Sequence, residues 1–247
     1  LTPQIASKFY NFDENDCESC DGSTWMGTLD ELNSYSGYWI NLSESDNVNL
    51  TGYRTDPSTV YELNSGNNLI SFPADEAYDI EDVLPDYLDG VITAVLAEGN
   101  AAMYMDGIWF GSLISLEGFN GYWFRSNEDI DFSYDIPDNA LSREVASVEK
   151  QVLPGYEYIQ SSKQSFYFIK DIPEAKIGDW IIAFNEDVVV GTRRWDGVMV
   201  DVPVMGDNNE FYSFAYVDEG QIPNLKLYKT STGELLQLHG SIPGFID

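Results

Sequence analysis

The stretch IWFGSLISLEGFNGYWFRS (residues 108–126) has a counterpart earlier in the same chain, TWMGTLDELNSYSGYWINL (residues 24–42). The two align without a gap at an offset of 84 residues, and seven of the nineteen aligned positions are identical, two tryptophans among them. We call residues 24–42 the first copy and residues 108–126 the second copy. Such periodicity is typical of repeat architectures, whose units bury their apolar faces against a neighbour or against their own second half.

The residues that precede the second copy predict short β-strands. NNLISFP (67–73) is an apolar run ended by a proline, and VITAVLA (91–97) is a second run. AAMYMDGIWFG (101–111) predicts two strands around a turn at Asp106–Gly107. Together with the second copy, these strands make up one full repeat unit.

One segment of this unit departs from the strand pattern. DIEDVLPDYL (79–88) begins with a potential N-cap, Asp79, and has acidic residues in its first turn, so we expect one short helix here. The first copy has no counterpart of these preceding elements. We therefore expect the chain to begin inside a repeat, as a portion of a longer array.

The composition changes after the second copy, because basic residues appear and the tryptophan repeat ends. Closely spaced apolar runs and turn signals predict about eight strands in the last hundred residues, a density typical of a β-sandwich. The predicted fold is mainly β: a tryptophan-containing β-repeat domain with one short helix, then a β-sandwich of jelly-roll or immunoglobulin-like type. The predicted ranges are a partial unit at 1–56, a full unit at 57–136, a linker at 137–152 and the sandwich at 153–247.

Charge restricts the partners that this chain can bind. It has 12 basic and 42 acidic residues, and a formal net charge of −30. A field of this sign repels phosphate backbones and anionic lipid headgroups, so we expect neither nucleic acid as a partner nor direct insertion into a membrane. The chain shows no initiator methionine and no cleavable apolar segment, so we expect a mature segment whose export signal has been removed or lies upstream.

Two groups of strings resemble modules of large secreted or surface proteins of marine bacteria and marine metagenomes. GNNLISFP, GSL and GYW (66–73, 111–113 and 121–123) are similar to one repeat unit of those proteins. GDWIIAFNEDVVVG, DVPVMG and KLY (178–191, 201–206 and 226–228) are similar to the β-module found beside it. This resemblance implies a secreted, modular protein. It does not imply an established activity, because the family is largely uncharacterised.

This chain departs from the pattern of the β-module at three positions. Ile182 and Glu186 stand where the pattern has glycine, and Val189 stands where it has cysteine.

Nucleophilic catalysis is not predicted. The chain has one histidine, His239, which leaves no clear Ser-His-Asp or Cys-His arrangement, and no nucleotide-binding or zinc-protease string occurs. A glycosidase needs only two carboxylates, which 42 acidic residues cannot exclude, but nothing singles out a pair. We therefore predict that the chain is not an enzyme.

Aromatic and cationic residues are the candidate ligand contacts. Exposed tryptophans stack on sugar rings, whereas tryptophans at matched repeat positions also form cores. An arginine pair in an acidic chain can dock a carboxylate or an acidic glycan, or can form an intramolecular salt bridge. We expect Trp195, beside the arginines, to be more exposed than Trp180. The candidates are Trp25, Trp39, Trp109, Trp123, Arg193, Arg194 and Trp195.

Two oxygen-rich loops are candidate calcium sites, although neither has EF-hand spacing and both are compatible with ordinary solvated turns. Their candidate ligands are Asp13, Asn15, Asp16 and Asp21 in the first loop, and Asp207 and Asn209 in the second. The first loop also holds the only two cysteines, Cys17 and Cys20. They are predicted to form a structural disulfide, with free thiols as the alternative. We expect no organic cofactor.

The sequence thus predicts a non-catalytic extracellular or cell-surface protein for display, adhesion or assembly into a fibre or filament. Its expected partners are neighbouring modules or copies of the same protein. The alternative is a carbohydrate-binding appendage of a secreted polysaccharide-degrading enzyme.

Overall fold

In the computed structural model, the described residues are 6–10, 23–40, 42, 55–56, 58–136 and 152–246, with only the backbone path described for 6–10 and 23–26. Over these described residues the fold is mainly β, with several antiparallel sheets and one short α-helix. Within these ranges, no helix is long and apolar enough to cross a membrane.

The full repeat unit is built on a five-stranded antiparallel sheet with the spatial order β4-β10-β6-β7-β8. Two smaller antiparallel pairs, β3 with β11 and β5 with β9, complete the unit. The strands predicted around NNLISFP, VITAVLA and AAMYMDGIWFG are therefore confirmed. The bounds are β3 Tyr61–Leu63, β4 Gly66–Ser71, β5 Tyr78–Asp79, β6 Ile92–Leu96, β7 Ala101–Met105, β8 Ile108–Gly111, β9 Ser115–Leu116, β10 Gly121–Ser126 and β11 Ile130–Phe132.

The turn between β7 and β8 lies where the sequence predicts it. Asp106 has φ 54° and Gly107 has φ 88°, so both central residues are in the left-handed region. A two-residue hairpin of this kind matches the twist of its flanking strands, and the Asp-Gly pair accommodates positive φ.

The predicted helix is present but shorter than DIEDVLPDYL. It forms one turn, α1 (Ile80–Val83), and a 3₁₀ turn, η1 (Asp86–Leu88), follows it. Pro85 separates the two, because a proline disfavours the helical conformation of the residue before it, and Leu84 is extended with ψ 121°. Asp79 lies at the N-cap position but makes no capping hydrogen bond from its side chain.

The core of this unit is rich in aromatic residues. Tyr61, Phe124, Phe132 and Tyr134 are buried together, and the Phe132 and Tyr134 rings meet edge to face with centroids 4.9 Å apart. Edge-to-face pairs of this kind are favourable beyond the apolar area that they bury. The second copy supplies Phe124 from β10, so the duplicated segment contributes directly to the core.

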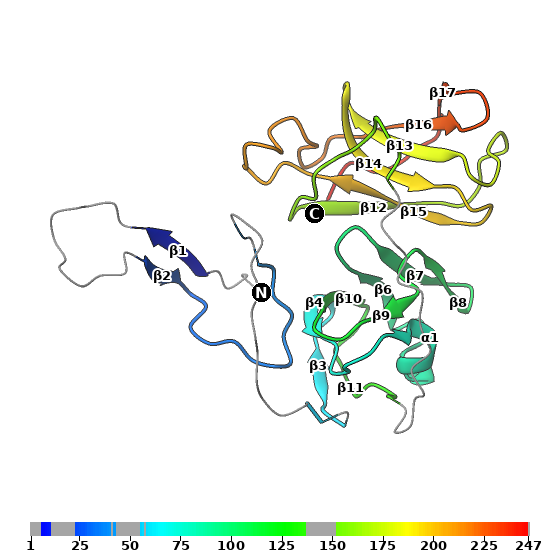
Figure 1. The fold of residues 1–247 in the computed structure, drawn as a ribbon. Coiled ribbons are helices and arrows are strands. Elements are labelled where there is room, and N and C mark those ends of the chain that lie inside the picture. Colours follow the sequence, from blue (N-terminus) through cyan, green and yellow to red (C-terminus); the bar gives the residue numbers. More distant parts are fainter. Residues whose placement is uncertain are drawn as a thin grey trace, which may run out of the picture.

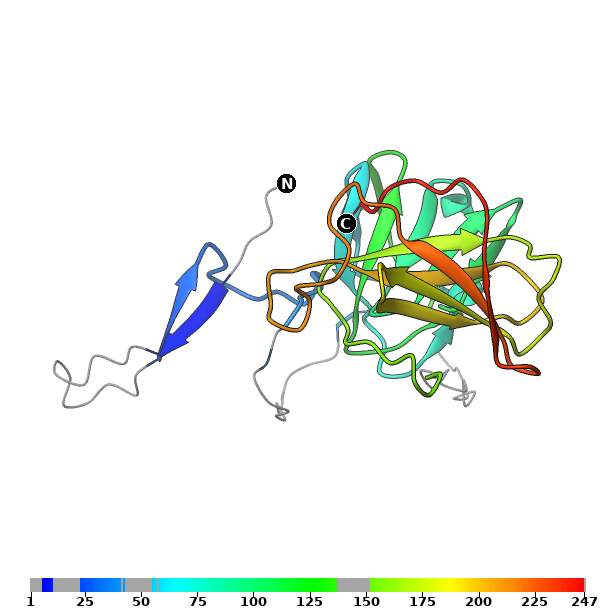
Figure 2. The same cartoon turned by 90° about the horizontal axis from the view of Figure 1, so that it is seen from above.

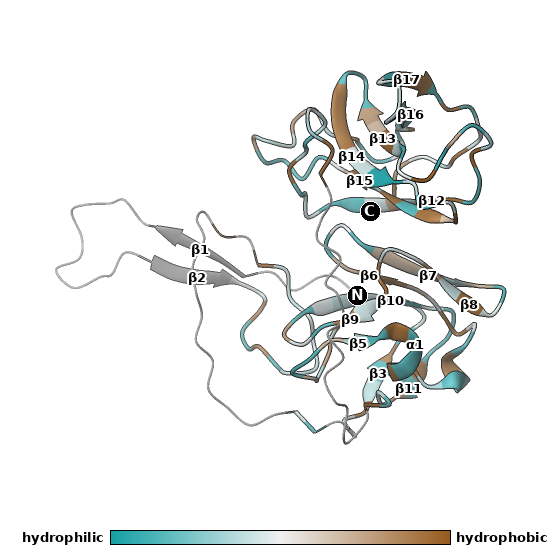
Figure 3. Cartoon of the chain, turned by 45° about the vertical axis from the view of Figure 1, so that its right-hand side comes forward, coloured by the Kyte–Doolittle hydropathy of each residue, from teal (hydrophilic) through white to brown (hydrophobic). Residues whose placement is uncertain are grey.

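The second region has a four-stranded antiparallel sheet, β14-β13-β16-β17, and a two-stranded sheet, β12-β15. Its core lies between the two sheets and includes Ile181, Val190, Val202 and Leu227. In Figure 3, hydrophobic residues colour much of β13 and β14. The bounds are β12 Gln164–Ile169, β13 Trp180–Asn185, β14 Val188–Arg194, β15 Val200–Met205, β16 Asn224–Lys229 and β17 Glu234–Gln237.

The prediction of about eight strands in this region is wrong for the described residues, which form six. Part of the difference lies at residues 211–217, where an aromatic-rich run folds into turns. Ser213 explains this, because its hydroxyl contacts Asp207 and Asn208 as well as the Glu210 carbonyl. Local bonds of serine to nearby groups compete with a strand ladder.

Glu186 shows how a departure from the family pattern is accommodated. It lies in the turn between β13 and β14 and has φ 53°, a conformation that favours the glycine of that pattern. Ile182, the second departure, is fully buried in the small cluster with Trp180 and Phe184. The hairpin therefore forms without either glycine.

The two cored regions lie one above the other in Figure 1, with β12 and β15 facing the sheet that carries β6, β7 and β8. Seen from above in Figure 2, the hairpin of β1 (Ala6–Tyr10) and β2 (Ser23–Gly27) stands apart from both. The predicted linker at 137–152 falls outside the described residues except for Val152, so its boundaries stay a prediction.

Candidate functional site

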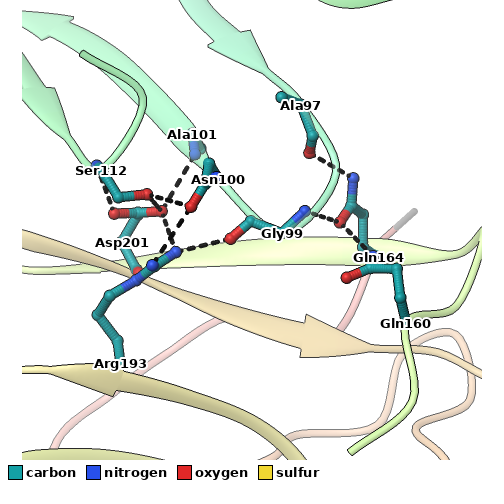
Figure 4. A network of polar contacts seen from close by, with 9 residues as sticks. All are labelled: Ala97, Gly99, Asn100, Ala101, Ser112, Gln160, Gln164, Arg193 and Asp201. Carbon is teal, nitrogen blue, oxygen red and sulfur yellow. Dashed lines mark hydrogen bonds and ion pairs between the residues drawn. The ribbon is translucent and has the colours of Figure 1, made fainter. Parts of the chain in front are cut away.

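The two regions meet at a buried ion pair (Figure 4). Arg193 on β14 contacts Asp201 on β15 at 2.8 Å, and the Arg193 Nε donates to the Asp201 carbonyl at 2.6 Å. From the repeat unit, the backbone N–H and the hydroxyl of Ser112 both donate to the Asp201 carboxylate, at 2.7 and 2.8 Å. The Ala101 N–H donates to the same carboxylate at 3.1 Å.

Arg193 also bonds to the repeat unit directly. Its guanidinium donates to the Gly99 carbonyl at 2.7 Å and, over a longer 3.4 Å, to the Asn100 side-chain oxygen. The Ser112 hydroxyl oxygen also lies 3.0 Å from the same Asn100 oxygen. Arg193 and Asp201 therefore contact the repeat unit at three places: the loop between β6 and β7, the first residue of β7, and Ser112, which follows β8.

The electrostatics of Asp201 follow from its burial. Its residue surface is 0% exposed, and this desolvation raises the pKa of its carboxyl group, whereas the charge of Arg193 and the hydrogen bonds from Ser112 act in the opposite direction. A general acid or base needs access to a substrate proton. A buried carboxylate that accepts four hydrogen bonds is suited instead to hold two regions together.

Gln164 makes a second attachment at the same interface. Its side-chain nitrogen donates to the Ala97 carbonyl at 2.9 Å, and its oxygen accepts from the Gly99 N–H at 3.1 Å. Gln160 supports it by donating to the Gln164 oxygen at 2.9 Å. The loop between β6 and β7 is thus held by a charged group at one end and an amide at the other.

The contact joins the strings on which the family resemblance rests. Ser112 belongs to the GSL string, Asp201 begins the DVPVMG string, and Arg193 lies just after GDWIIAFNEDVVVG. Sequence reasoning singled out Arg193 but missed Asp201 and Ser112. A signal for Asp201 was present, since a carboxylate that heads an apolar strand is rarely buried without a partner.

A cavity of about 260 Å³ lies beside the ion pair. Trp180 and Trp195 line it together with Arg194, and the repeat unit contributes residues that include Ser112 and Ile114. Arg194 is exposed, and no ion pair is formed by it in the described part of the chain. Within the described part of the chain, the cavity thus combines an apolar wall with the guanidinium of Arg194.

The expectation about Trp195 is wrong. Trp195 is 4% exposed and Trp180 is 8% exposed, so both are buried, and Trp195 packs in the main core of the second region. The Trp195 N–H donates to the Asp179 carbonyl at 2.7 Å, which holds its backbone at the end of β14. Stacking of a flat ligand on Trp195 is therefore confined to the part of its ring that lines the cavity.

The repeated tryptophans differ in their surroundings. Trp109 is half-buried against the core and meets Tyr104 edge to face at 5.3 Å, while Trp123 is half-buried on β10. Trp39 is 42% exposed, and the side chain of Trp25 lies outside the description. Among the described side chains, Trp39, Trp109 and Trp123 make no ring contact with one another.

Only the second of the two oxygen-rich loops lies within the described residues. Asp13, Asn15, Asp16, Asp21, Cys17 and Cys20 lie outside the described residues, so the first loop and its disulfide stay predictions. In the second loop, Asp207 accepts hydrogen bonds from the Asn209 N–H at 2.7 Å and from the Ser213 hydroxyl at 2.9 Å. Among the described residues, no three His, Cys, Asp or Glu side chains converge to hold a metal ion.

The first copy packs against the outer edge of β4. The Gly37 N–H donates to the Leu69 carbonyl at 3.1 Å, and the Ser71 N–H donates to the Tyr35 carbonyl at 3.0 Å. At the crossing, a methyl group built on Gly121 would lie 2.8 Å from the Gly37 Cα. The two glycines occupy equivalent positions of the two copies, so the repeat meets itself there.

Both copies share one local hydrogen bond. The Tyr38 hydroxyl accepts from the Asn33 N–H at 2.9 Å, and the Tyr122 hydroxyl accepts from the Glu117 N–H at 2.7 Å. The same offset of 84 residues separates the two pairs. One hydrogen bond of the repeat is thus duplicated, whereas residues 37–40 and 42 form no strand where the second copy forms β10.

In comparisons with known proteins, the chain matches no family model, no curated protein and no solved structure.

Proposed function

We propose that this chain is a non-catalytic part of an extracellular or cell-surface protein that serves display, adhesion or assembly. The observation that carries the proposal is the buried contact of Ser112, Arg193 and Asp201. The strings that mark the two modules converge on this contact, so the modules act as one structural block. A block of this kind suits a protein that bears load or holds a surface at a fixed geometry.

The finer architecture is part of the same proposal. We take the first region as a tryptophan-containing β-repeat domain and the second as a β-sandwich of jelly-roll or immunoglobulin-like type. Two sheets that enclose a common core support the second assignment. The contact between Gly37 and Gly121 supports the first, because repeat units gain stability from their neighbours.

The acidic surface supports an extracellular setting and ionic assembly. A net charge of −30 makes molecules repel one another at low ionic strength, and divalent cations relieve such repulsion by binding between carboxylates. Calcium is therefore the proposed ion, with neighbouring modules or other molecules of this chain as the proposed partners.

Sedimentation velocity of the full chain in a calcium series tests this function. We expect association that depends on protein concentration and is promoted by calcium, with magnesium at equal ionic strength as the control. A panel of marine polysaccharides, followed by tryptophan fluorescence, is run in the same buffer. A chain that stays monomeric and adheres to no surface under all conditions would contradict the proposal, as would hydrolysis of any polysaccharide.

The second candidate is a carbohydrate-binding appendage, and the cavity beside Trp180, Trp195 and Arg194 is the observation in its favour. Its apolar wall and available guanidinium fit one acidic sugar ring. Saturable quenching by an acidic polysaccharide, lost in Arg194→Ala and kept in Lys170→Ala, would support it. Equal quenching of tryptophan fluorescence in both variants would mean that the polysaccharide does not bind in this cavity.

A further inference from the structure

The cavity beside the ion pair is walled by both regions of the chain. The repeat unit contributes Asn100, from the loop between β6 and β7, and Ile114, while the second region contributes Trp180, Trp195 and Met199. Its volume of about 260 Å³ lies below the range of about 300–1,000 Å³ that is typical of pockets for drug-sized ligands. The cavity therefore has room for one ring-sized group.

Thr192 lines this cavity with a side chain that has no polar partner. It lies on β14 and is 5% exposed, and its hydroxyl forms no hydrogen bond with the described part of the chain. Among the described residues, the only fully buried side-chain oxygen or nitrogen that lacks a partner is Oε1 of Gln160. The Thr192 oxygen therefore keeps accessible surface, and the cavity that Thr192 lines supplies it.

Three further polar side chains of the wall have unused hydrogen-bonding groups. The Asn100 oxygen accepts from Arg193 at 3.4 Å, whereas the Asn100 amide nitrogen donates to no described residue. The Arg194 guanidinium is exposed and has no ion pair with a described residue. Asp196 accepts from the Val198 N–H at 3.1 Å through one carboxylate oxygen, which leaves the other as an acceptor. Donors and an acceptor therefore line the same small space.

These groups together select a ring that carries a carboxylate and hydroxyls. A guanidinium pairs with a carboxylate through two parallel hydrogen bonds. Hydroxyls both donate and accept, so they match the Asn100 amide, the Thr192 hydroxyl and the Asp196 carboxylate. An inorganic anion would meet the like charge of Asp196, and a neutral sugar would leave the guanidinium without a counter-charge. The apolar face of a sugar ring suits the two tryptophans.

We propose that this cavity binds one hexuronate unit of a glycan, a sugar ring whose last carbon is a carboxylate. Arg194 pairs with the carboxylate, while Thr192, Asn100 and Asp196 contact hydroxyls. Because Asn100 belongs to the repeat unit and Arg194 to the second region, the bound sugar contacts both modules. The inference rests on the second candidate function, carbohydrate binding, and names its ligand and the residues that select it.

Saturation-transfer NMR of the full chain tests the ligand. The probes are the methyl glycosides of glucuronate, galacturonate, mannuronate and guluronate, with the four neutral parent glycosides and acetate as controls. We expect saturable binding of at least one uronate, and binding of its neutral parent and of acetate that is weaker by about tenfold or more. No saturable binding of any uronate up to about 20 mM would overturn the proposal. Equal binding of acetate or of the neutral parent would also overturn it.

Variants of the full chain locate the binding. Arg194→Met is expected to weaken uronate binding by about tenfold or more, and the isosteric Thr192→Val by about two- to tenfold. Asn100→Asp replaces an amide donor with a carboxylate, so we expect a loss of about tenfold or more. Lys170→Met, which removes an exposed cation outside the cavity, is the matched control and retains binding. Thermal unfolding without ligand verifies the fold of each variant, and Thr192→Val, which keeps the side-chain shape, decides if another variant fails to fold.

The outcome is separable from those of the proposed functions. Polysaccharide binding that is unchanged in Arg194→Met and Thr192→Val would overturn this site and leave the carbohydrate-binding candidate standing. Uronate binding that these variants weaken, in a chain that never associates with calcium, would support the site and contradict the assembly function.

Discussion

Equivalent positions of the two copies of the repeated segment differ in burial even where the amino acid is the same. Leu116 and Leu32 are leucines at the same repeat position, yet Leu116 lies in the core and Leu32 is exposed to solvent. Both copies keep the same hydrogen bond from a backbone N–H to a tyrosine hydroxyl. This hydrogen bond therefore follows from the segment itself, whereas the burial of the segment and its strand β10 depend on the elements packed around it.

The largest expected effect is a difference in stability between substitutions at Phe124 and at Ile40, the equivalent positions of the two copies. Phe124→Ala removes a fully buried ring, and we expect it to lower the free energy of unfolding by about 3–5 kcal/mol. Ile40→Ala at the equivalent exposed position is expected to change it by less than about 0.5 kcal/mol. Urea denaturation measures both. Effects of equal size would mean that the first copy is covered as well.

The next largest effect concerns the ion pair between Arg193 and Asp201, through which the second region contacts the full repeat unit. Arg193→Met leaves the Asp201 charge buried without its cation, and we expect a loss of about 3 kcal/mol in thermal or urea unfolding. The double variant Arg193→Met, Asp201→Leu should recover much of it. Arg194→Met, an exposed neighbour, is the control. A mild effect of Arg193→Met would show that the ion pair does not fasten the regions.

A smaller effect tests the edge where the copies meet. The methyl group of Gly121→Ala would lie 2.8 Å from the Gly37 Cα, which forces the first copy away from β4. We expect faster hydrogen exchange at the Gly37 and Ser71 amides, and a stability loss of about 1–2 kcal/mol. Gly240→Ala, which meets nothing within 4 Å, is the matched control. Unchanged exchange at both amides would count against a direct contact.

The smallest expected effect is a dependence on pH. Burial raises the pKa of Asp201 above its ordinary value of 3.8, so the folded state retains this proton to higher pH than the unfolded state. The stabilisation by the protonated form is complete below the ordinary value and is lost as pH rises through the raised one. Each unit of elevation corresponds to about 1.4 kcal/mol.

Urea unfolding from pH 3 to pH 7, compared with Asp201→Asn, measures this step. The difference in stability between the wild-type chain and the variant should shrink as pH rises through that window. A difference that grows over the same range would mean that the pKa of Asp201 is lowered.

Sequence patterns predicted much of the repeat unit and less of the second region. The Asp106–Gly107 turn and the strands on either side were accessible because turn chemistry and strand periodicity are local. The short helix was predicted too long, because Pro85 interrupts it. About eight strands were predicted in the second region and six are described, and residues 211–217 form turns because of a local network around Ser213.

The candidate site was predicted only in part. Arg193 stood out as a cation in an acidic chain, but its partner Asp201 and the donor Ser112 were missed because they lie in a different strand and a different unit. Trp195 was expected to be exposed beside charged residues, yet it packs into the core. Proximity along the chain says little about which way a side chain points across a sheet.

The sequence by itself determined the mainly β character, the duplication, the positions of the tight turns and the acidic charge, since each depends on nearby residues or on composition. The tertiary structure decided which copy is buried, which arginine forms the ion pair and which tryptophans reach solvent. Those outcomes depend on segments far apart in the chain, because burial and ion pairing are properties of a contact between two surfaces.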